Sequence, residues 1–376
     1  MPDRILVFSD WFAPGFRAGG PIRSLVNLTE SVGLLFDIVT RNTDHYSLVP
    51  YDLPTGQWVE HSSHVRVMYL REHEISYSRI RNFMQGNYSR IYLNSLWSPR
   101  FTLLPLVAGK MMGKTSRIII APRGMLKPAA LSIKAPKKKI IMALMRYTGI
   151  ASSVCWHATN VEEKDEILAH MSANANVRVA SNLPANIPSP LPVPIKKSGE
   201  MHLICIARIS AEKGILEALE FLQSVQSAGK VRVDFFGTFQ DEKFLGTCKE
   251  RAAALKGVNC FFHGELPPSQ IPDRMKEAHF FYLPTRGENY GHAIIEALQY
   301  GRPVIISDRT PWKFKVDDVA GFSPPLTYDG FAPVLYHCLG MDQDAYNKAC
   351  NAAAAAGKKI VSDPAVLDAS RHIFDS

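Results

Sequence analysis

The stretch GENYGHAIIEAL, from Gly287 to Leu298, carries two carboxylates, Glu288 and Glu296, eight residues apart. Partners on one helix face are three or four residues apart, and partners on one strand face are two apart. Eight fits neither spacing. The preceding run HFFYLP indicates a strand, TRGE a turn, and HAIIEALQY a helix that starts near Gly291. Glu288 is therefore expected before the helix, and Glu296 roughly a turn and a half inside it.

This arrangement suggests a site for a nucleotide diphosphate sugar. Carboxylates accept hydrogen bonds from vicinal diols, and the free N–H groups of a helix N-terminus accept phosphate. The N–H groups of residues 290–292 lie between the two acids, as the phosphates of such a donor lie between its sugar and its ribose. The alternative is an ordinary amphipathic helix with two solvated acids.

A cationic motif, IARISAEKG, follows the first strand-like run of the second half of the chain. Arg208 and Lys213 are five residues apart across its turn, and Gly214 opens the helix-like stretch GILEALEFLQ. A bidentate Arg together with a point-charge Lys suits a diphosphate. The alternative is a solvated basic loop.

Three weaker signals come from the first half of the chain. Gly19 and Gly20 precede Pro21 after the run ILVFS; such a turn lets backbone approach a ligand, although a purely structural turn is the alternative. The motif is not GxGxxG, so dinucleotide binding is not indicated. Arg123, in APRGML, stands where ligand-facing loops begin, or is a solvated arginine. His157, in HATNVEEKDEIL, is expected to be a packed histidine, with ligand contact as the alternative.

The elements that must position these residues alternate along the whole chain. Short, continuous apolar runs are separated by helix-like stretches, which is typical of parallel strands covered on both faces by helices. Two such series flank the proline-rich stretch LPANIPSPLPVPIKKSGE, so we predict two Rossmann-like, doubly wound α/β domains joined by a stiff connector. A long surface loop within one domain is the alternative. We expect a first domain at residues 1–185, a linker at 186–200, a second domain at 201–360 and a C-terminal helix at 361–376.

Composition and charge narrow the class of protein. The chain has 376 residues, of which 46% are apolar and 21% charged, and no apolar run approaches the length of a membrane span. The start, MPDRILVFSD, does not resemble a signal peptide. Six cysteines without a CxxC pair are expected to be buried free thiols in a reducing cytoplasm. The net charge of +8 indicates an anionic partner; without zinc-finger or RNP-like motifs, phosphates and lipid headgroups are favoured over nucleic acid.

Together, the Glu-x7-Glu spacing, RISAEKG, GGPIRSLVNL, APRGML and GENYGHAIIEALQYGRPVIISDRTPW resemble the GT-B glycosyltransferases of family 4 (group 1), of the bacterial type that builds O-antigen, capsule or exopolysaccharide. The resemblance reaches along most of the chain. It implies an α/β GT-B fold with two Rossmann-like domains facing a cleft, donor binding mainly in the second domain, acceptor binding in the first, and metal-independent transfer with retention. It also implies that the C-terminal helix crosses back to the first domain.

The resemblance assigns a role to each residue. Arg208 and Lys213 would hold the diphosphate, Glu288 the donor sugar and Glu296 the ribose. Where many relatives carry a histidine near the sugar, this chain has APRG, so Arg123 would stand in its place. The predicted catalytic residues are Arg208, Lys213 and Glu288. The predicted substrate contacts are Gly19, Gly20, Arg123, His157, Asn289, Tyr290, Gly291, His292 and Glu296.

No metal site and no cofactor are expected, because the one Asp-x-Asp, Asp342-Gln343-Asp344, looks like the start of a helix capped by Asp342. The predicted function is hexosyl transfer from a nucleotide diphosphate sugar to a glycan or lipid-linked glycan in cell-surface polysaccharide assembly. A nucleotide-sugar 2-epimerase and a non-catalytic nucleotide- or glycan-binding protein are the alternatives. The expected location is the cytoplasm. The basic, partly amphipathic stretch 127–149 could lie on the inner face of the membrane, or could be a helix with solvated lysines.

Overall fold

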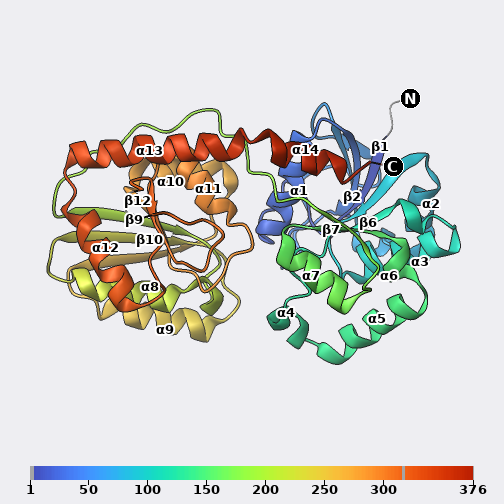
Figure 1. The fold of residues 1–376 in the computed structure, drawn as a ribbon, viewed down its shortest axis with the longest axis horizontal. Helices are drawn as coiled ribbons and strands as arrows, with labels where there is room; N and C mark the ends of the chain where they lie inside the picture. The colour runs from blue at the N-terminus through green and yellow to red at the C-terminus, as the bar shows by residue number, and fades with distance from the viewer. Residues whose placement is uncertain (1–3, 316–317, 376) are drawn as a thin grey trace. The chain divides into compact units, whose positions relative to one another are not determined.

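The protein consists of two compact units, each with a parallel β-sheet at its centre (Figure 1). The computed structural model describes residues 4–315 and 318–375 of the chain. Unit 1 comprises Met1–Leu183 together with Asp363–Ser376, and unit 2 comprises Pro184–Ser362.

Unit 1 is built on an eight-stranded sheet with the order β3-β4-β2-β1-β5-β6-β7-β8. All neighbouring strands are parallel except β3, which runs antiparallel to β4. The strands are β1 (Arg4–Phe8), β2 (Leu35–Arg41), β3 (Trp58–Glu60), β4 (Val65–Leu70), β5 (Tyr88–Leu93), β6 (Ile118–Ile120), β7 (Cys155–Ala158) and β8 (Asn176–Val179). Along β1, Leu6 and Phe8 join one apolar core while Ile5 and Val7 join the other, as the period of two of a strand requires.

Helices complete the two layers that bury this sheet. The α-helices of unit 1 are α1 (Gly20–Ser31), α2 (Tyr77–Gln85), α3 (Leu104–Met111), α4 (Pro128–Ser132), α5 (Ala135–Tyr147), α6 (Ile150–Ser153), α7 (Val161–His170) and α14 (Pro364–His372). The last of these, α14, lies within the range expected for the C-terminal helix, 361–376, and begins with Pro364 in its first turn. The following Ile373 and Phe374 are buried in the same apolar core as Ile5 and Val7.

Unit 2 is built on a six-stranded sheet with the order β11-β10-β9-β12-β13-β14, all of it parallel. Its strands are β9 (Glu200–Ile206), β10 (Lys230–Phe236), β11 (Val258–Gly264), β12 (Phe280–Leu283), β13 (Val304–Ile306) and β14 (Gly321–Phe322). Its α-helices are α8 (Ile215–Phe221), α9 (Glu242–Ala253), α10 (Ile271–Glu277), α11 (His292–Gln299), α12 (Tyr328–Gly340) and α13 (Gln343–Val361).

The proline-rich segment is packed on unit 2. Arg302, which is fully buried, donates to the carbonyl oxygens of Pro192 and Met275 at 2.7 Å each. The N–H of Leu191 bonds to the carbonyl of Tyr300 at 3.2 Å. Prolines lack an N–H but keep their carbonyls as acceptors, so the segment adopts no helix or strand and is still fixed by hydrogen bonds.

The predicted fold class is confirmed: both units are parallel-sheet α/β domains of Rossmann-like form. Strands β3, β8 and β14 were not expected from the sequence. All three lie at sheet edges or are only two to four residues long, so they lack a continuous buried apolar run. All six cysteines are free thiols, and five of them are buried. Among the described residues, no helix is both long and apolar enough to cross a bilayer.

Candidate functional site

The candidate site lies in unit 2 at the point where strand order reverses. From β9 the chain moves outward to β10 and β11, and then returns to the other side of β9 with β12 and β13. Strands β9 and β12 are therefore adjacent and parallel. The loops that follow their carboxyl ends are far apart in the sequence but lie next to each other in space. Ligands of open α/β sheets bind at such a switch point.

A close backbone contact joins these two loops. Gly214 has φ +68°, and a Cβ atom added there would lie 1.8 Å from the carbonyl oxygen of Pro284, so only glycine fits. The carbonyl of Glu212 accepts from the N–H of Arg286 at 3.0 Å and from the Thr285 hydroxyl at 3.1 Å. The loop after β9 is thereby fixed against the loop after β12.

This contact brings Lys213 and Glu288 together. The Lys213 ammonium lies 2.6 Å from Glu288 Oε1, and each side chain is only 14% exposed. Both predicted residues are therefore in one place, as a direct ion pair with little access to water. Such a pair interacts more strongly than one at the surface, because the surrounding protein screens it less.

Arg208 lies in the same loop but is far more open. Its guanidinium pairs with Glu212 at 3.3 Å, and its side chain is 48% exposed. An exposed ion pair four residues apart contributes little to stability. The guanidinium can thus change partner at little cost in folding free energy.

The N-terminus of α11 carries the other predicted residues of unit 2. Gly291 precedes the helix in a left-handed conformation, with φ 79°. His292 and Glu296 are both buried, one turn apart on the same helix face. Tyr290 is buried next to them, with its ring 4.8 Å from that of His292. Asn289 is half-buried in the preceding loop.

The segment SDRTPW, at 307–312, has no role that its sequence predicts, and in the structure it supports this loop. The indole N–H of Trp312 donates to the carbonyl of Tyr290, and the two rings pack edge to face at 5.5 Å. The Ser307 hydroxyl donates to the carbonyl of Thr285 at 2.5 Å, and the N–H of Glu288 donates to the carbonyl of Arg309 at 3.3 Å. The segment therefore holds the loop that carries Glu288 at both ends.

In unit 1, Gly19 and Gly20 stand at the start of α1, next to open space. Gly19 has φ +68°, and a Cβ added at either glycine would meet no atom within 4 Å. The preceding loop is fixed by Asp44, which accepts from the N–H groups of Phe16 at 2.9 Å and Arg17 at 3.2 Å. A ligand could therefore approach the backbone at Gly19 and Gly20, as the sequence predicts, without a steric clash within unit 1.

Arg123 and His157 belong to one internal hydrogen-bond chain. The Arg123 guanidinium donates to Asn94 Oδ1 at 3.0 Å, Asn182 Oδ1 at 2.5 Å and the Tyr92 hydroxyl oxygen at 2.8 Å. Because Arg123 always donates, the Tyr92 hydroxyl gives its proton to His157 Nδ1 at 2.8 Å, and Nε2–H donates to the carbonyl of Ala180 at 2.9 Å. Burial, helped by the Arg123 charge, lowers the pKa of His157 to about 3.

Both ring nitrogens of His157 are therefore used inside the protein, and the residue is only 2% exposed. It has the geometry of the packed histidine that the sequence favoured. Arg123 is half-buried, and its three partners are neutral oxygens, so its positive charge is solvated but not neutralised by them.

No group of three or more His, Cys, Asp or Glu suited to a metal ion occurs within residues 4–315 and 318–375. Asp342 of the Asp-x-Asp motif is the N-cap of α13, and its carboxylate accepts from the N–H of Ala345 at 2.9 Å. The helix cap expected from the sequence is therefore present.

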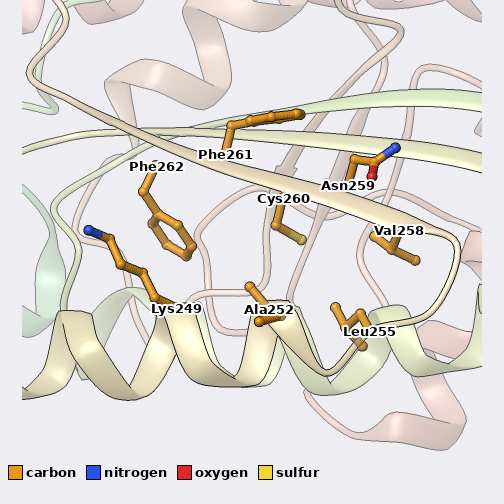
Figure 2. A pocket seen from close by; sticks show the side chains of 9 residues that line it. Lys249, Ala252, Leu255, Val258, Asn259, Cys260, Phe261 and Phe262 are labelled. Atoms are coloured by element: carbon orange, nitrogen blue, oxygen red, sulfur yellow. The ribbon is translucent and has the colours of Figure 1, made fainter.

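A separate cavity opens between α9 and the edge strand β11 (Figure 2). Its lining includes the apolar side chains of Ala252, Leu255, Val258 and Phe262 together with the polar side chains of Lys249 and Asn259. None of the predicted site residues borders it, so it is distinct from the candidate site.

Comparison with solved structures defines the class of fold. HepE of Anabaena, solved in complex with UDP and glucose, superimposes with a TM-score of 0.72 at 14% identity, over 99% of this chain and 98% of that one. Sucrose-phosphate synthase from Thermosynechococcus elongatus gives a TM-score of 0.67 at 17% identity, over 98% and 96% of the two chains. The protein therefore has the GT-B fold.

Sequence comparisons point more narrowly, and to unit 2. Residues 192–313 match the family model described as Glycosyl transferases group 1, and this range contains Arg208, Lys213, Glu288 and Glu296. Alpha-monoglucosyldiacylglycerol synthase of Streptococcus pneumoniae (strain ATCC BAA-255 / R6) is 32% identical over 111 residues, which cover 29% of this chain and only 24% of that enzyme. Fold and matched segment together support a GT-B glycosyltransferase.

Proposed function

We propose that this protein is a retaining glycosyltransferase that moves a hexosyl group from a nucleotide diphosphate sugar to a glycan or lipid-linked glycan acceptor. The observation that carries this proposal is the meeting of Lys213 and Glu288 at the switch point of unit 2, 2.6 Å apart, within the segment that matches glycosyl transferases group 1. HepE, which shares the fold, was solved with UDP-glucose, which supports a donor of this chemical class.

In this proposal the cations hold the diphosphate. Lys213 and Arg208 now pair with the carboxylates of Glu288 and Glu212, and phosphate oxygens would be competing partners of the same charge. The N-terminus of α11 adds a positive helix dipole. These groups stabilise the negative charge that develops on the departing nucleotide diphosphate.

The remaining predicted residues orient the substrates. Glu288 would contact the donor sugar, and Glu296 would accept hydrogen bonds from the ribose diol. Gly19 and Gly20 leave the N-terminus of α1 open to phosphate oxygens. Unit 1 would supply the acceptor contacts.

The reaction needs no protein nucleophile. The bond between the anomeric carbon and the diphosphate oxygen breaks, and its electron pair stays on that oxygen. The acceptor hydroxyl oxygen bonds to the anomeric carbon on the same face, and its proton goes to the departing phosphate. We propose that this transfer is metal-independent and serves the assembly of cell-surface polysaccharide at the cytoplasmic side of the membrane.

The first test is thermal unfolding in the presence of UDP, GDP, dTDP and CMP. A nucleotide at about 100 times its Kd adds roughly 2.7 kcal/mol to stability, which corresponds to a rise of about 5–10 °C for a unit of this size. The matched control is Lys213→Met, which should lose that rise. If no nucleotide stabilises the wild-type protein, the donor site is refuted.

Turnover distinguishes the proposal from its alternatives. A transferase releases nucleotide diphosphate in proportion to the acceptor added, whereas a 2-epimerase converts the donor without an acceptor. A binding protein would show the thermal shift without turnover. With the stabilising nucleotide known, its sugar derivatives can be incubated with candidate acceptors and the nucleotide released can be measured.

A further inference from the structure

The crossover from β6 to β7 carries a helix whose outer face is apolar. In α5, Met142 and Met145 are buried in the core, while Ile140 and Leu144 are 61% and 55% exposed. Tyr147, at the end of the helix, is 91% exposed. Since the helix advances 100° per residue, these three exposed side chains form one stripe along it. Figure 1 shows α4 and α5 along the lower margin of unit 1.

Basic side chains border this stripe on both sides. Lys137 is on one side of it, and Lys139 and Arg146 are on the other, by the same helical spacing. All three are exposed. Lys138, in contrast, turns toward the protein: its ammonium donates to the carbonyl of Ala130 at 2.6 Å and lies 5.4 Å from the centre of the Trp97 ring. The outer face of α5 is thus an apolar stripe with one cation on one side and two on the other.

The charge of the chain is concentrated in this region. Residues 75–161 contain 14 of the 43 Lys and Arg, whereas all 35 Asp and Glu lie outside this range. The rest of the chain therefore carries a net negative charge. The positive net charge of the protein comes from this one acid-free segment.

The lysines of α5 are also placed where a helix disfavours them. Lys137, Lys138 and Lys139 lie in the first turns, close to the positive end of the helix dipole, and the first turn has no acidic residue. Each such cation destabilises the isolated helix. Contact with an external anionic surface would instead make these cations stabilising.

We propose that the face formed by Lys137, Lys139, Ile140, Leu144, Arg146 and Tyr147 docks on an anionic lipid bilayer. The three apolar side chains enter the boundary between headgroups and acyl chains, and the three cations contact the headgroup phosphates. A nucleic acid would match the cations but would leave the apolar stripe in water, so a lipid surface fits the whole face better.

This docking deepens the proposed function, because α4 directly follows the loop that contains Arg123 at the carboxyl end of β6. Gly20 begins α1 at the carboxyl end of β1, in the same parallel sheet. Docking through α5 would therefore bring the edge proposed to take the acceptor near the lipid that carries it. The binding of the face to lipid can be measured without any nucleotide sugar, so its failure is distinguishable from failure of the proposed transfer.

The experiment is co-sedimentation of the full chain with vesicles of phosphatidylcholine containing increasing amounts of phosphatidylglycerol, at 0.15 M salt. The wild-type protein should bind in proportion to the anionic lipid and should not bind pure phosphatidylcholine. Each basic residue near an anionic surface contributes about a factor of five, so the K137Q/K139Q/R146Q variant should bind about 100-fold more weakly. The charge-matched control, K243Q/K256Q/K359Q, changes exposed lysines of unit 2 and should bind as the wild type does.

A second variant tests the apolar stripe. I140S/L144S keeps every charge, and should lose at least about tenfold in vesicle binding because two apolar side chains no longer leave water. Its control is I195S/Y336S, which changes two exposed apolar residues of unit 2. The proposal is wrong if I140S/L144S binds anionic vesicles as tightly as the wild type does and heparin releases both proteins from the vesicles equally. The face would then be a general polyanion-binding surface. Absence of wild-type binding to anionic vesicles would also overturn it.

Discussion

The ammonium of Lys213 lies 2.6 Å from a carboxylate oxygen of Glu288, although the two residues are 75 positions apart in the sequence. They meet because Gly214 allows the loop after β9 to touch the end of β12. The carboxylate of Glu288 is a competing anion for the cation that is proposed to hold the diphosphate. The two residues are therefore expected to act as a coupled pair.

This coupling sets the expected behaviour of Glu288→Gln. Removing the carboxylate frees Lys213 for phosphate, so the affinity for free nucleotide should stay equal or rise by up to about tenfold. The turnover number should fall, because a carboxylate beside the sugar gains strength as positive charge develops on the ring. Steady-state kinetics and calorimetry with the nucleotide measure the two effects separately.

Lys213→Met is the matched partner of that variant and should weaken nucleotide binding. In the Glu288→Gln background, the loss caused by Lys213→Met should be larger than in the wild-type background, because Lys213 then gives up no ion pair when it binds phosphate. Equal losses in both backgrounds, or a Glu288→Gln variant that no longer binds nucleotide, would contradict the coupled pair.

Glu296→Gln should have a different kinetic signature. A ribose contact forms in both the ground state and the transition state, so its loss should raise the KM for the donor and leave kcat nearly unchanged. A charge-assisted hydrogen bond is worth about 1.5–3 kcal/mol, which predicts about a 10- to 150-fold loss in kcat/KM. Glu296 is buried, so the thermal midpoint of the variant must be compared with that of the wild type. An unchanged KM would remove Glu296 from the donor site.

Arg208→Ala should separate activity from stability. Its ion pair with Glu212 is exposed, so the free energy of unfolding should change by less than about 1 kcal/mol. A contact to diphosphate is worth more, and kcat/KM should fall about 10- to 150-fold. The control is Arg251→Ala, an exposed arginine of α9, which should alter neither quantity. Full activity of Arg208→Ala would remove Arg208 from the diphosphate site.

The strands were predictable from the sequence because a parallel strand buried on both faces is a local signal: a short, continuous apolar run. The placement of Arg208, Lys213, Glu288 and Glu296 after strands or in the following helix could be predicted for the same reason. Their assembly at one switch point required only the expected strand order of doubly wound sheets.

The contacts within the site depend on long-range packing, which leaves little local signal. The role of Trp312 follows from its bond to Tyr290, 22 residues earlier. The sequence signal for this role was only an aromatic residue a few positions after a strand of unit 2. Such a pattern is too common to be specific. Arg123 was predicted to contact substrate, and its three internal partners come from positions 29–59 residues away, so no local pattern could reveal them.

The hydrogen-bond chain of unit 1 gives a prediction about pH. Burial lowers the pKa of His157 to about 3, whereas an unfolded histidine has a pKa of about 6.5. Between these values the unfolded state binds more protons, so stability is fully present above about pH 6.5 and falls as the pH decreases. The expected loss is about 1.4 kcal/mol per pH unit below 6.5, or about 2 kcal/mol at pH 5.

His157→Gln removes this titration and should flatten the dependence of unit 1 stability on pH. The measurement is urea unfolding at pH 7 and pH 5, followed by tryptophan fluorescence, because Trp11, Trp58, Trp97 and Trp156 all lie in unit 1 and Trp312 alone lies in unit 2. Burial raises the pKa values of Asp10 and Glu166, which acts in the opposite direction, but these contributions cancel when wild type and variant are compared. His279→Gln is the control: burial lowers the pKa of His279 to about 4, yet the residue belongs to unit 2 and should leave the unit 1 transition unchanged. An equal loss of stability between pH 7 and pH 5 in the wild type and in His157→Gln would show that His157 does not remain neutral through its bonds to Tyr92 and Ala180.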